Sequence, residues 1–480
     1  MKYIAYILLS ILVYLAIFWN LDYMPVRLWD ESRLAINALE MYKNGNYIVT
    51  YFDGLPDMWN TKPPLMIWLQ VLMFKAFGIS VLSLRLPSAI SALLTTIAIL
   101  FFSIKYLKSF WFGFIAVFVL ISIDGYIELH SIRTGDYDSL LTLFTTLSGL
   151  TYFMFIETKN NKYLLLFFIS LMFSVLSKGI AGLMFIPGLF IYSLWRKQII
   201  SILINKKFYI GLLIFLVPVL GIYLLREAYN SGYLEAVSNN EWGGRYFTNK
   251  NINSDILYYF KRLTRQRLVP WYNIVPISIG FGMLSDKKKV KNLTIFLSSM
   301  IFPYLLIISY SRTKLVWYDV PTFPFIAILI AILLYDIFIR IMKKKWMNYG
   351  FLNKVIPFIF IFSVIGVPYL KVIKKNSRPQ DYVYDKMAFD LGKYLQDGVK
   401  GINDLNGFTI VYTGYRPQID FYKRILEDEG IDIKFNDWNK LEKGDKVLAV
   451  RKEDIDKIEK IYIITKLKNK GSLAIYQIIQ

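Results

Sequence analysis

Long apolar stretches recur along the first three quarters of the chain, and short polar loops separate them. A helix of roughly 17–25 apolar residues is long enough to cross a bilayer. The pattern therefore predicts about 11 membrane-spanning helices, near residues 3–21, 81–104, 111–126, 139–156, 163–177, 180–195, 209–226, 269–284, 292–310, 317–339 and 353–370. No small-residue cleavage site follows the first stretch, so we expect an uncleaved span there and not a signal peptide.

The polar segment between the first two spans contains two further helical patterns. Residues 30–43 place Leu34, Ala38 and Met41 on one face, which predicts an amphipathic helix lying on the membrane. Residues 64–77 form a second apolar helix, which follows a proline pair and ends at Gly78. This helix is too short to cross the bilayer, so we expect it at the membrane interface as well.

Residues 371–480 differ in pattern, because charges of both signs alternate with short β-rich runs. The runs predict strands at 408–412, 431–435, 446–450, 461–466 and 472–478, with helices near 382–396, 417–429 and 452–459 between them. We therefore predict a transmembrane domain over 1–370 and a small α/β domain over 371–480. The Thr413-Gly414-Tyr415 turn follows a strand, but a single glycine does not make a phosphate-binding loop. A structural or acceptor-docking role is therefore favoured for this domain over a second active site.

The composition agrees with a membrane protein. Hydrophobic residues make up 55% of the 480 residues, charged residues make up 19%, and the mean hydropathy is +0.42. Soluble domains carry about 25% charged residues. The formal net charge is +21, which would indicate nucleic-acid binding in a soluble protein. Here the basic residues occupy short loops between spans, so we expect a lipid bilayer as the partner and no nucleic acid.

The distribution of charge predicts the topology. If the N-terminus is inside, the inner loops hold Lys105, Lys108, Lys159, Lys162, Arg196, Lys197, Lys206, Lys207, Lys287, Lys288, Lys289, Lys291, Arg340, Lys343, Lys344 and Lys345. The acids gather at the other ends of the spans. We therefore expect a multi-pass protein of the cytoplasmic (inner) membrane, with its active site and C-terminal domain on the extracytoplasmic side. Nucleotides do not reach that side readily, which disfavours a nucleotide-sugar or ATP-driven enzyme.

Two acidic positions are candidates for catalysis. Asp30 and Glu31 follow the first span, where they could be solvated loop acids or a helix N-cap, but Arg33 and Lys62 share their loop. Asp138 stands where a span begins, and an acid at that depth is a candidate site residue. The chain has no Cys and a single His, which excludes a Cys nucleophile and a His-rich metal site.

Several cations are expected near the same membrane depth, where they would suit a phosphate or pyrophosphate. They are Arg33, Lys62, Arg85, Lys178, Arg245 and Lys314. The alternative for each is a side chain that snorkels to lipid head groups, and for Arg85 and Lys178 the two interpretations have equal weight. Aromatic residues at the outer span ends indicate an interfacial belt, although Tyr318 could instead stack on a sugar ring.

Short motifs along the chain resemble those of one group of membrane enzymes. The motifs are Asp30-Glu31 with Arg33, Gly45-Asn46-Tyr47, Asn60-Thr61-Lys62-Pro63-Pro64-Leu65, Phe77-Gly78, Arg85-Leu86-Pro87-Ser88, Asp138-Ser139-Leu140-Leu141, Ser177-Lys178-Gly179, and Thr313-Lys314-Leu315 with Tyr318 and Pro321. Over roughly residues 1–340 the chain resembles the aminoarabinose transferase and protein O-mannosyltransferase superfamily, whose members are GT-C fold glycosyltransferases.

This resemblance implies an inverting glycosyltransferase that moves a sugar from a polyprenyl-phosphate donor to a lipid, glycan or protein acceptor on the outer face. It implies that Asp30 is the general base and that Asp138 helps to place the acceptor or sugar. Arg33, Lys62 and Arg245 would hold the lipid phosphate. These roles agree with the need for cations where negative charge develops. Glu31, Arg85, Lys314 and Tyr318 complete the predicted substrate-binding set.

Two departures from the family pattern concern metal binding. Aminoarabinose transferases carry Glu before Lys-Pro-Pro, where this chain has Thr61, and the His that can join that Glu at a metal falls near Asn240. We therefore predict no metal at that place and no cofactor, and the departures argue against aminoarabinose as the sugar. The alternative function is a transporter or flippase of lipid-linked sugars, which would need cavity charges reachable from both faces.

Overall fold

The computed structural model describes residues 2–128, 130–243, 255–344, 350–382 and 386–480. Among these residues, 7 helices are long and apolar enough to cross a membrane. They are α4 (Val81–Phe102, continued by η1, Ser103–Leu107), α6 (Asp138–Thr158), α7 (Asn161–Lys178, continued by η2, Gly179–Leu183), α10 (Lys206–Tyr229), α15 (Lys288–Tyr310), α16 (Phe323–Lys343, preceded by η6, Val316–Thr322) and α17 (Gly350–Ser377).

Four of the expected spans fall on shorter apolar helices. These are α1 (Lys2–Ile17), α5 (Phe110–Ile121), α8 (Ile186–Trp195) and α14 (Ile274–Met283). Short helical segments connect the bundle, namely α9 (Ile199–Leu203), α11 (Tyr233–Val237), η3 (Ser238–Trp242), α13 (Tyr258–Arg262), η4 (Leu263–Arg267) and η5 (Trp271–Asn273). A multi-pass helical protein is thus confirmed, and the number of 11 passes stays a prediction.

The two helices predicted in the first polar segment are present as α2 (Asp30–Asn44) and α3 (Leu65–Phe77). Gly45 ends α2 with a φ of 69°, and its N–H donates to the carbonyl of Met41 at 3.1 Å. A two-stranded hairpin, β1 (Tyr51–Phe52) and β2 (Leu55–Pro56), lies between the helices. These elements carry the acids and bases that the sequence singled out.

The expectation that α2 lies on the membrane with one apolar face is wrong. Its residues from Glu31 to Met41 are buried apart from Arg33, which is half-buried. The reason is tertiary packing, because α2 lies between α3 and α19 (Pro417–Asp428). Ala35 and Leu39 share one hydrophobic cluster with Phe421 and other residues near the C-terminus.

A five-stranded sheet forms near the C-terminus, in the order β4-β3-β5-β7-β6. Its strands are β3 (Phe408–Val411), β4 (Ile433–Phe435), β5 (Lys446–Ala449), β6 (Ile464–Lys470) and β7 (Leu473–Ile478). Helix α18 (Lys386–Val399) precedes β3, and α19 and α20 (Lys452–Ile461) lie between strands. β3 pairs in parallel with β4 and β5, whereas β7 runs antiparallel to β5 and β6. All five predicted strands and all three predicted helices are therefore present.

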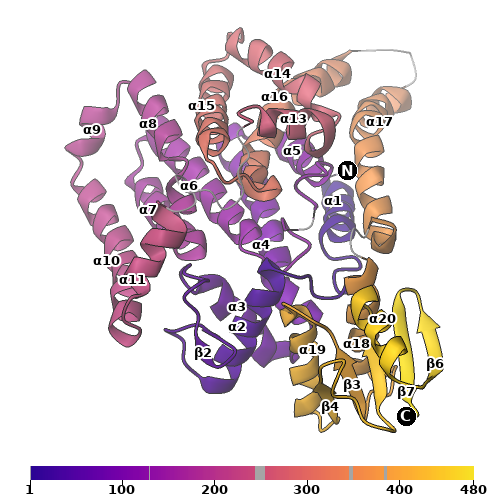
Figure 1. Cartoon of the computed structure of the whole chain (residues 1–480). Helices are drawn as coiled ribbons and strands as arrows, with labels where there is room; N and C mark the ends of the chain where they lie inside the picture. The colour runs from indigo at the N-terminus through magenta and orange to yellow at the C-terminus, as the bar shows by residue number, and fades with distance from the viewer. Residues whose placement is uncertain (1, 129, 244–254, 345–349, 383–385) are drawn as a thin grey trace.

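This sheet lies at one end of the helical bundle, beside α2 and α3 (Figure 1). Side chains join the two parts. The N–H of Val26 donates to Tyr422 Oη at 2.8 Å, and Arg424 forms ion pairs with Glu40 and Asp53 at 2.6 and 2.7 Å. The domain boundary predicted at residue 370 falls inside α17, which continues to Ser377, because the apolar pattern ends before the helix does. The division into two domains stays a prediction.

Candidate active site

A polar cleft lies where the start of α2, the start of α6, the end of α7 and η6 meet. Its charged and aromatic lining residues are Asp30, Arg33, Trp59, Lys62, Asp136, Tyr137, Asp138, Lys178, Trp317 and Tyr318. A second, apolar cavity of about 340 Å³ adjoins it and is lined by Leu141, Ile180, Ala181, Met184, Ile307 and Ile308 among others. Lys62, Asp138, Lys178 and Tyr318 line both, so they mark the junction between cleft and cavity.

Asp30 is the exposed acid of the cleft. It is the first residue of α2, where the helix dipole favours a negative charge. The preceding Trp29 has a φ of 78°, an uncommon value for a residue with a side chain, and it stacks on Tyr415 with ring centroids 5.1 Å apart. Backbone strain of this kind concentrates at functional sites. The start of α2 is thereby held at the cleft with its carboxylate accessible to an incoming molecule.

Asp138 is the buried acid of the cleft. It begins α6 and is 3% exposed. Its two carboxylate oxygens accept hydrogen bonds from Lys178 Nζ at 2.6 and 2.7 Å. The same ammonium group lies 5.3 Å from the ring centre of Tyr318. The acid expected at membrane depth therefore faces the cleft together with a cation. Lys178 was one of the candidate phosphate-binding cations, for which snorkelling to lipid head groups had equal weight, and its position places it at the cleft.

Lys62 lies on the wall shared by cleft and cavity. Its Nζ is 3.2 Å from Glu241 Oε1 and 5.3 Å from the ring centre of Tyr137. Thr61 Oγ1 also donates to Glu241 at 3.4 Å. Glu241 therefore places a carboxylate beside the Lys-Pro-Pro motif from a distant part of the chain. Sequence reasoning missed Glu241 because no motif marks it, whereas its neighbour Asn240 donates to the carbonyl of Met58 at 3.1 Å.

The loop that carries Lys62 is fixed by hydrogen bonds from several elements. Asn60 donates to Asn37 at 2.8 Å and accepts from Tyr137 at 2.9 Å. Tyr233 donates to the carbonyl of Thr61 at 2.7 Å. Because these hydrogen bonds fix the loop before a ligand binds, little free energy is lost in ordering its side chains on binding.

Arg33 lines the cleft while bound to Asp57. Two hydrogen bonds join them, Nε to Oδ2 at 2.9 Å and Nη2 to Oδ1 at 2.7 Å, and the guanidinium lies 4.3 Å from the ring centre of Phe52. Burial by itself raises the pKa of Asp57, but the hydrogen bond and charge of Arg33 outweigh burial and hold that pKa below its ordinary value. The carboxylate thus stays ionised and keeps the arginine in a fixed orientation at the cleft.

Glu31 and Arg85 do not line the cleft or the cavity, which corrects their prediction as substrate-binding residues. Arg85 Nε and Nη2 donate to the two carboxylate oxygens of Glu31 at 2.7 and 2.9 Å, and both side chains are buried. Arg85 also donates to the carbonyls of Leu21, Met24 and Pro25. The pair therefore fastens the start of α2 to α4 and to the segment that follows α1.

We expect Glu31→Gln to destabilise the protein by about 3–5 kcal/mol, because it leaves the buried Arg85 without its counter-charge. Thermal unfolding in detergent measures the effect. Lys43→Ala removes one partner of an exposed ion pair with Asp428 and should cost under about 1 kcal/mol. Equal unfolding midpoints for the two variants would contradict the structural role of Glu31.

The remaining predicted binding residues have different positions. Tyr318 lines both cleft and cavity, as a sugar-stacking or lipid-contacting residue would. Lys314 lines neither, and its Nζ donates to the carbonyl of Ser311 at 2.7 Å, so a direct contact with substrate is not supported by its position. Arg245 lies outside the described residues, and its role stays a prediction.

His130 and Asp136 form an ion pair at the edge of the cleft. His130 Nδ1 lies 3.2 Å from Asp136 Oδ2, and the imidazole stacks on Trp317 at 3.8 Å between ring centroids. Burial lowers the pKa of His130, but the charge and hydrogen bond of Asp136 raise it more, so that it lies above its ordinary value. The pKa of Asp136 is lowered, because the pairing with His130 and Thr134 outweighs burial.

These shifts predict how stability depends on pH. The stabilisation by the pair is fully present below the ordinary His pKa of about 6.5 and is lost as the pH rises through the higher folded pKa. We expect the free energy of unfolding of the wild type to fall more than that of His130→Gln between pH 6 and pH 9. Unfolding midpoints across this range measure the difference, and parallel profiles for the two proteins would contradict the pairing.

One group in the described part of the chain has the spacing of metal ligands. Ligand atoms of Asp30, His130 and Asp136 all lie within 4.8 Å of one another. A metal at this place would have to displace the ion pair between His130 and Asp136, whose Nδ1 and Oδ2 atoms are 3.2 Å apart.

We therefore expect a divalent-ion chelator to leave the turnover unchanged at neutral pH. The assay compares initial rates with and without the chelator. Loss of activity that a divalent cation restores would contradict this expectation and would point to the Asp30, His130 and Asp136 group as its site.

Comparisons with known proteins agree with this fold. The family model for dolichyl-phosphate-mannose-protein mannosyltransferases matches residues 61–223. An uncharacterised protein of Aquifex aeolicus (strain VF5) is 26% identical over 332 residues, which are 68% of this chain and 63% of that protein. The undecaprenyl phosphate-alpha-4-amino-4-deoxy-L-arabinose arabinosyl transferase of Aeromonas salmonicida (strain A449) is 22% identical over 65% of this chain and 56% of its own length.

Solved structures show the same fold. The crystal structure of ArnT from Cupriavidus metallidurans bound to undecaprenyl phosphate aligns over 99% of this chain and 97% of its own, with a TM-score of 0.66 at 14% sequence identity. The apo form of that protein aligns with a TM-score of 0.68. The predicted resemblance to the GT-C fold glycosyltransferases of the aminoarabinose transferase and protein O-mannosyltransferase superfamily is thus confirmed: residues 61–223 match the mannosyltransferase family model, and the fold matches that of ArnT.

Proposed function

We propose that this protein is an inverting glycosyltransferase that moves a sugar from a polyprenyl-phosphate donor to a lipid, glycan or protein acceptor. The observation that carries the proposal is the junction of a polar cleft with an apolar cavity, where Lys62 and Lys178 lie. A polyprenyl chain suits the apolar cavity and its phosphate suits the lysines, whereas the cleft has a volume of about 30 Å³ and must widen to admit the sugar. The matched arabinosyl transferase, whose name contains undecaprenyl phosphate, supports the same donor class.

The donor phosphate must compete with carboxylates that already hold the lysines. The ion pair of Lys62 with Glu241 is 3.2 Å long, whereas that of Lys178 with Asp138 is 2.6 Å long and uses both carboxylate oxygens. We therefore assign the phosphate first to Lys62, and Arg33, which lines the same cleft while Asp57 holds it, is the second candidate. Lys178 holds Asp138 in a fixed orientation, so that this acid can place the sugar or the acceptor.

The reaction is a single displacement. The acceptor oxygen attacks the anomeric carbon, the bond from that carbon to the phosphate oxygen breaks, and the electron pair leaves with the phosphate. Asp30 accepts the proton of the acceptor group, and Lys62 with Arg33 stabilises the charge that grows on the phosphate. A carboxylate close to the anomeric carbon also stabilises an oxocarbenium-like transition state. One displacement inverts the anomeric configuration.

We further propose the setting of the reaction. The basic loops support an N-terminus on the cytoplasmic side of the membrane, with the cleft and the C-terminal sheet on the extracytoplasmic side. Tyr415 of the C-terminal segment stacks on Trp29, directly before Asp30. An acceptor that reaches Asp30 would therefore pass this segment, which supports the acceptor-docking role.

The test uses the purified protein in vesicles that contain radiolabelled polyprenyl-phosphate sugars, a hexose and a pentose in separate assays. A cell-envelope extract of the source organism supplies the acceptors. We expect the label to leave the polyprenyl lipid and to appear on an acceptor with the inverted anomeric configuration. Label that crosses the bilayer while it remains on the polyprenyl lipid would contradict the transferase and favour a flippase.

A further inference from the structure

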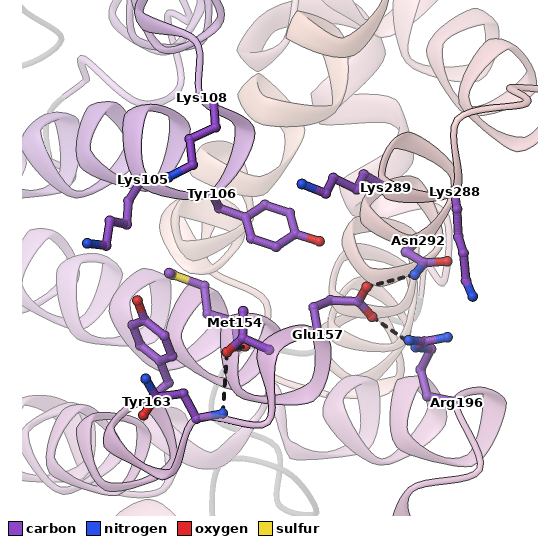
Figure 2. Close-up of a pocket in the computed structure, with 12 residues that line it drawn as sticks. Lys105, Tyr106, Lys108, Met154, Glu157, Tyr163, Arg196, Lys288, Lys289 and Asn292 are labelled. Carbon is purple, nitrogen blue, oxygen red and sulfur yellow. Dashed lines mark hydrogen bonds and ion pairs between the residues drawn. The ribbon is translucent and has the colours of Figure 1, made fainter.

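A second polar pocket lies at the far end of the helices that form the cleft (Figure 2). α6 begins with Asp138 at the cleft and ends beside this pocket, and it contains 21 residues. A helix of that length extends about 30 Å, which is the thickness of the hydrocarbon core. Because α6 crosses this thickness, the pocket at its end is expected at head-group depth in the leaflet opposite the cleft. The volume of the pocket is about 750 Å³.

The pocket contains one acid, Glu157, and that acid is already saturated. Arg196 Nε lies 2.9 Å from Glu157 Oε1, which also accepts from Tyr192 Oη at 2.9 Å. Asn292 donates to Glu157 Oε2 at 2.8 Å. Figure 2 shows Arg196 and Asn292 on either side of this carboxylate. One positive charge is thus neutralised, and the carboxylate is held in place.

Four further cations line the same pocket. They are Lys105, Lys108, Lys288 and Lys289. Within the described ranges, no carboxylate lies within 4.0 Å of their ammonium groups. Lys289 reaches toward Tyr106, with its Nζ 5.5 Å from the ring centre (Figure 2). Positive loops orient a membrane protein without forming a pocket, so four uncompensated charges around one hollow need a further explanation.

A neighbouring cavity of about 490 Å³ shares Lys288 and Lys289 with this pocket. The rest of its wall is largely apolar and includes Phe112, Leu293 and Ile332. A cationic pocket that adjoins an apolar cavity at head-group depth matches a molecule with an anionic head and a hydrocarbon chain. A free phosphate ion would use the lysines but would leave the apolar cavity unfilled.

We propose that this pocket binds the phosphate head group of an anionic membrane lipid, with an acyl chain in the neighbouring cavity. Lysine binds phosphate as a point charge, and Arg196 is held beside the site by Glu157. The binding residues come from η1, the end of α8 and the start of α15. A lipid that contacts all three segments ties them together and stabilises the folded protein by mass action.

The test titrates the purified full-length protein in a neutral detergent with phosphatidylglycerol, with phosphatidylcholine and with inorganic phosphate. Native mass spectrometry and the thermal unfolding midpoint report binding. We expect phosphatidylglycerol to bind and to raise the midpoint, and the other two probes to do neither. Removing two lysines by Lys288→Ala with Lys289→Ala should weaken phosphatidylglycerol binding about thirtyfold.

The matched control is Lys206→Ala with Lys207→Ala, which removes two exposed lysines that do not line the pocket. It should bind phosphatidylglycerol as the wild type does. The proposal would be overturned if phosphatidylcholine bound as tightly as phosphatidylglycerol, or if the two double variants lost the same phosphatidylglycerol affinity. If inorganic phosphate raised the unfolding midpoint as much as phosphatidylglycerol does, the ligand would be a phosphate ion and not a lipid. If the first double variant unfolds without lipid, Lys105→Ala with Lys108→Ala takes its place. The readout involves no sugar transfer, so it is independent of the proposed catalytic function.

Discussion

The Asp30→Asn variant is expected to lose sugar transfer by about 10²–10⁴-fold while it still binds the donor lipid. Asn has nearly the shape of Asp but cannot accept the proton of the acceptor group. Asp30 is exposed, lines the cleft and has no ion pair among the described residues. Its replacement therefore breaks no ion pair that stabilises this part of the fold. The effect should fall on the catalytic rate and not on donor affinity.

The control for this variant is Asp53→Asn, which changes an exposed acid of the same polar segment that pairs with Arg424 outside the cleft. It should transfer sugar at nearly the wild-type rate. The measurement is the initial rate of transfer at saturating donor, together with the donor dissociation constant. An Asp30→Asn variant with wild-type turnover would remove Asp30 from the role of base.

The second large effect is expected for Lys62→Ala, which should reduce transfer by about 10²–10³-fold and weaken donor binding. The charge on the phosphate grows as it leaves, so a cation at the junction of cleft and cavity favours the transition state. The change also leaves Glu241 without its cation, and this acid then repels the phosphate. Both effects act on the donor, so acceptor affinity should change little.

Lys75→Ala is a suitable comparison, because Lys75 is exposed on α3 and contacts Tyr47 away from the cleft. Titration with donor lipid, followed by titration with acceptor at fixed donor, separates the two affinities. If Lys62→Ala binds the donor as tightly as Lys75→Ala does, Lys62 does not hold the phosphate.

Local patterns in the sequence were sufficient for most of the architecture. The period of the apolar residues located the long helices, and the alternation after residue 400 located all five strands within a few residues. The depth of Asp138 at a span end and the Lys-Pro-Pro motif led to two residues that line the cleft. In each case the signal lies within one element or one turn of the chain.

Contacts between distant segments could not be predicted in this way. Glu31 and Arg85 are adjacent to each other only in the folded chain, and nothing in either motif indicates that each is the partner of the other. The burial of α2 depends on α19, which follows it by more than 370 residues. Because tertiary packing can cover a face that looks amphipathic in the sequence, the membrane-surface interpretation of α2 was wrong.

The central claim is that the cleft holds a polyprenyl-phosphate sugar and that Asp30 is needed to consume it. Mass spectrometry of the lipids that copurify with the wild type and with Asp30→Asn tests both parts together. The account predicts free polyprenyl phosphate with the wild type, which has turned over its donor, and sugar-bearing polyprenyl phosphate with the variant. The same lipids in both preparations, or no polyprenyl phosphate in either, would contradict it.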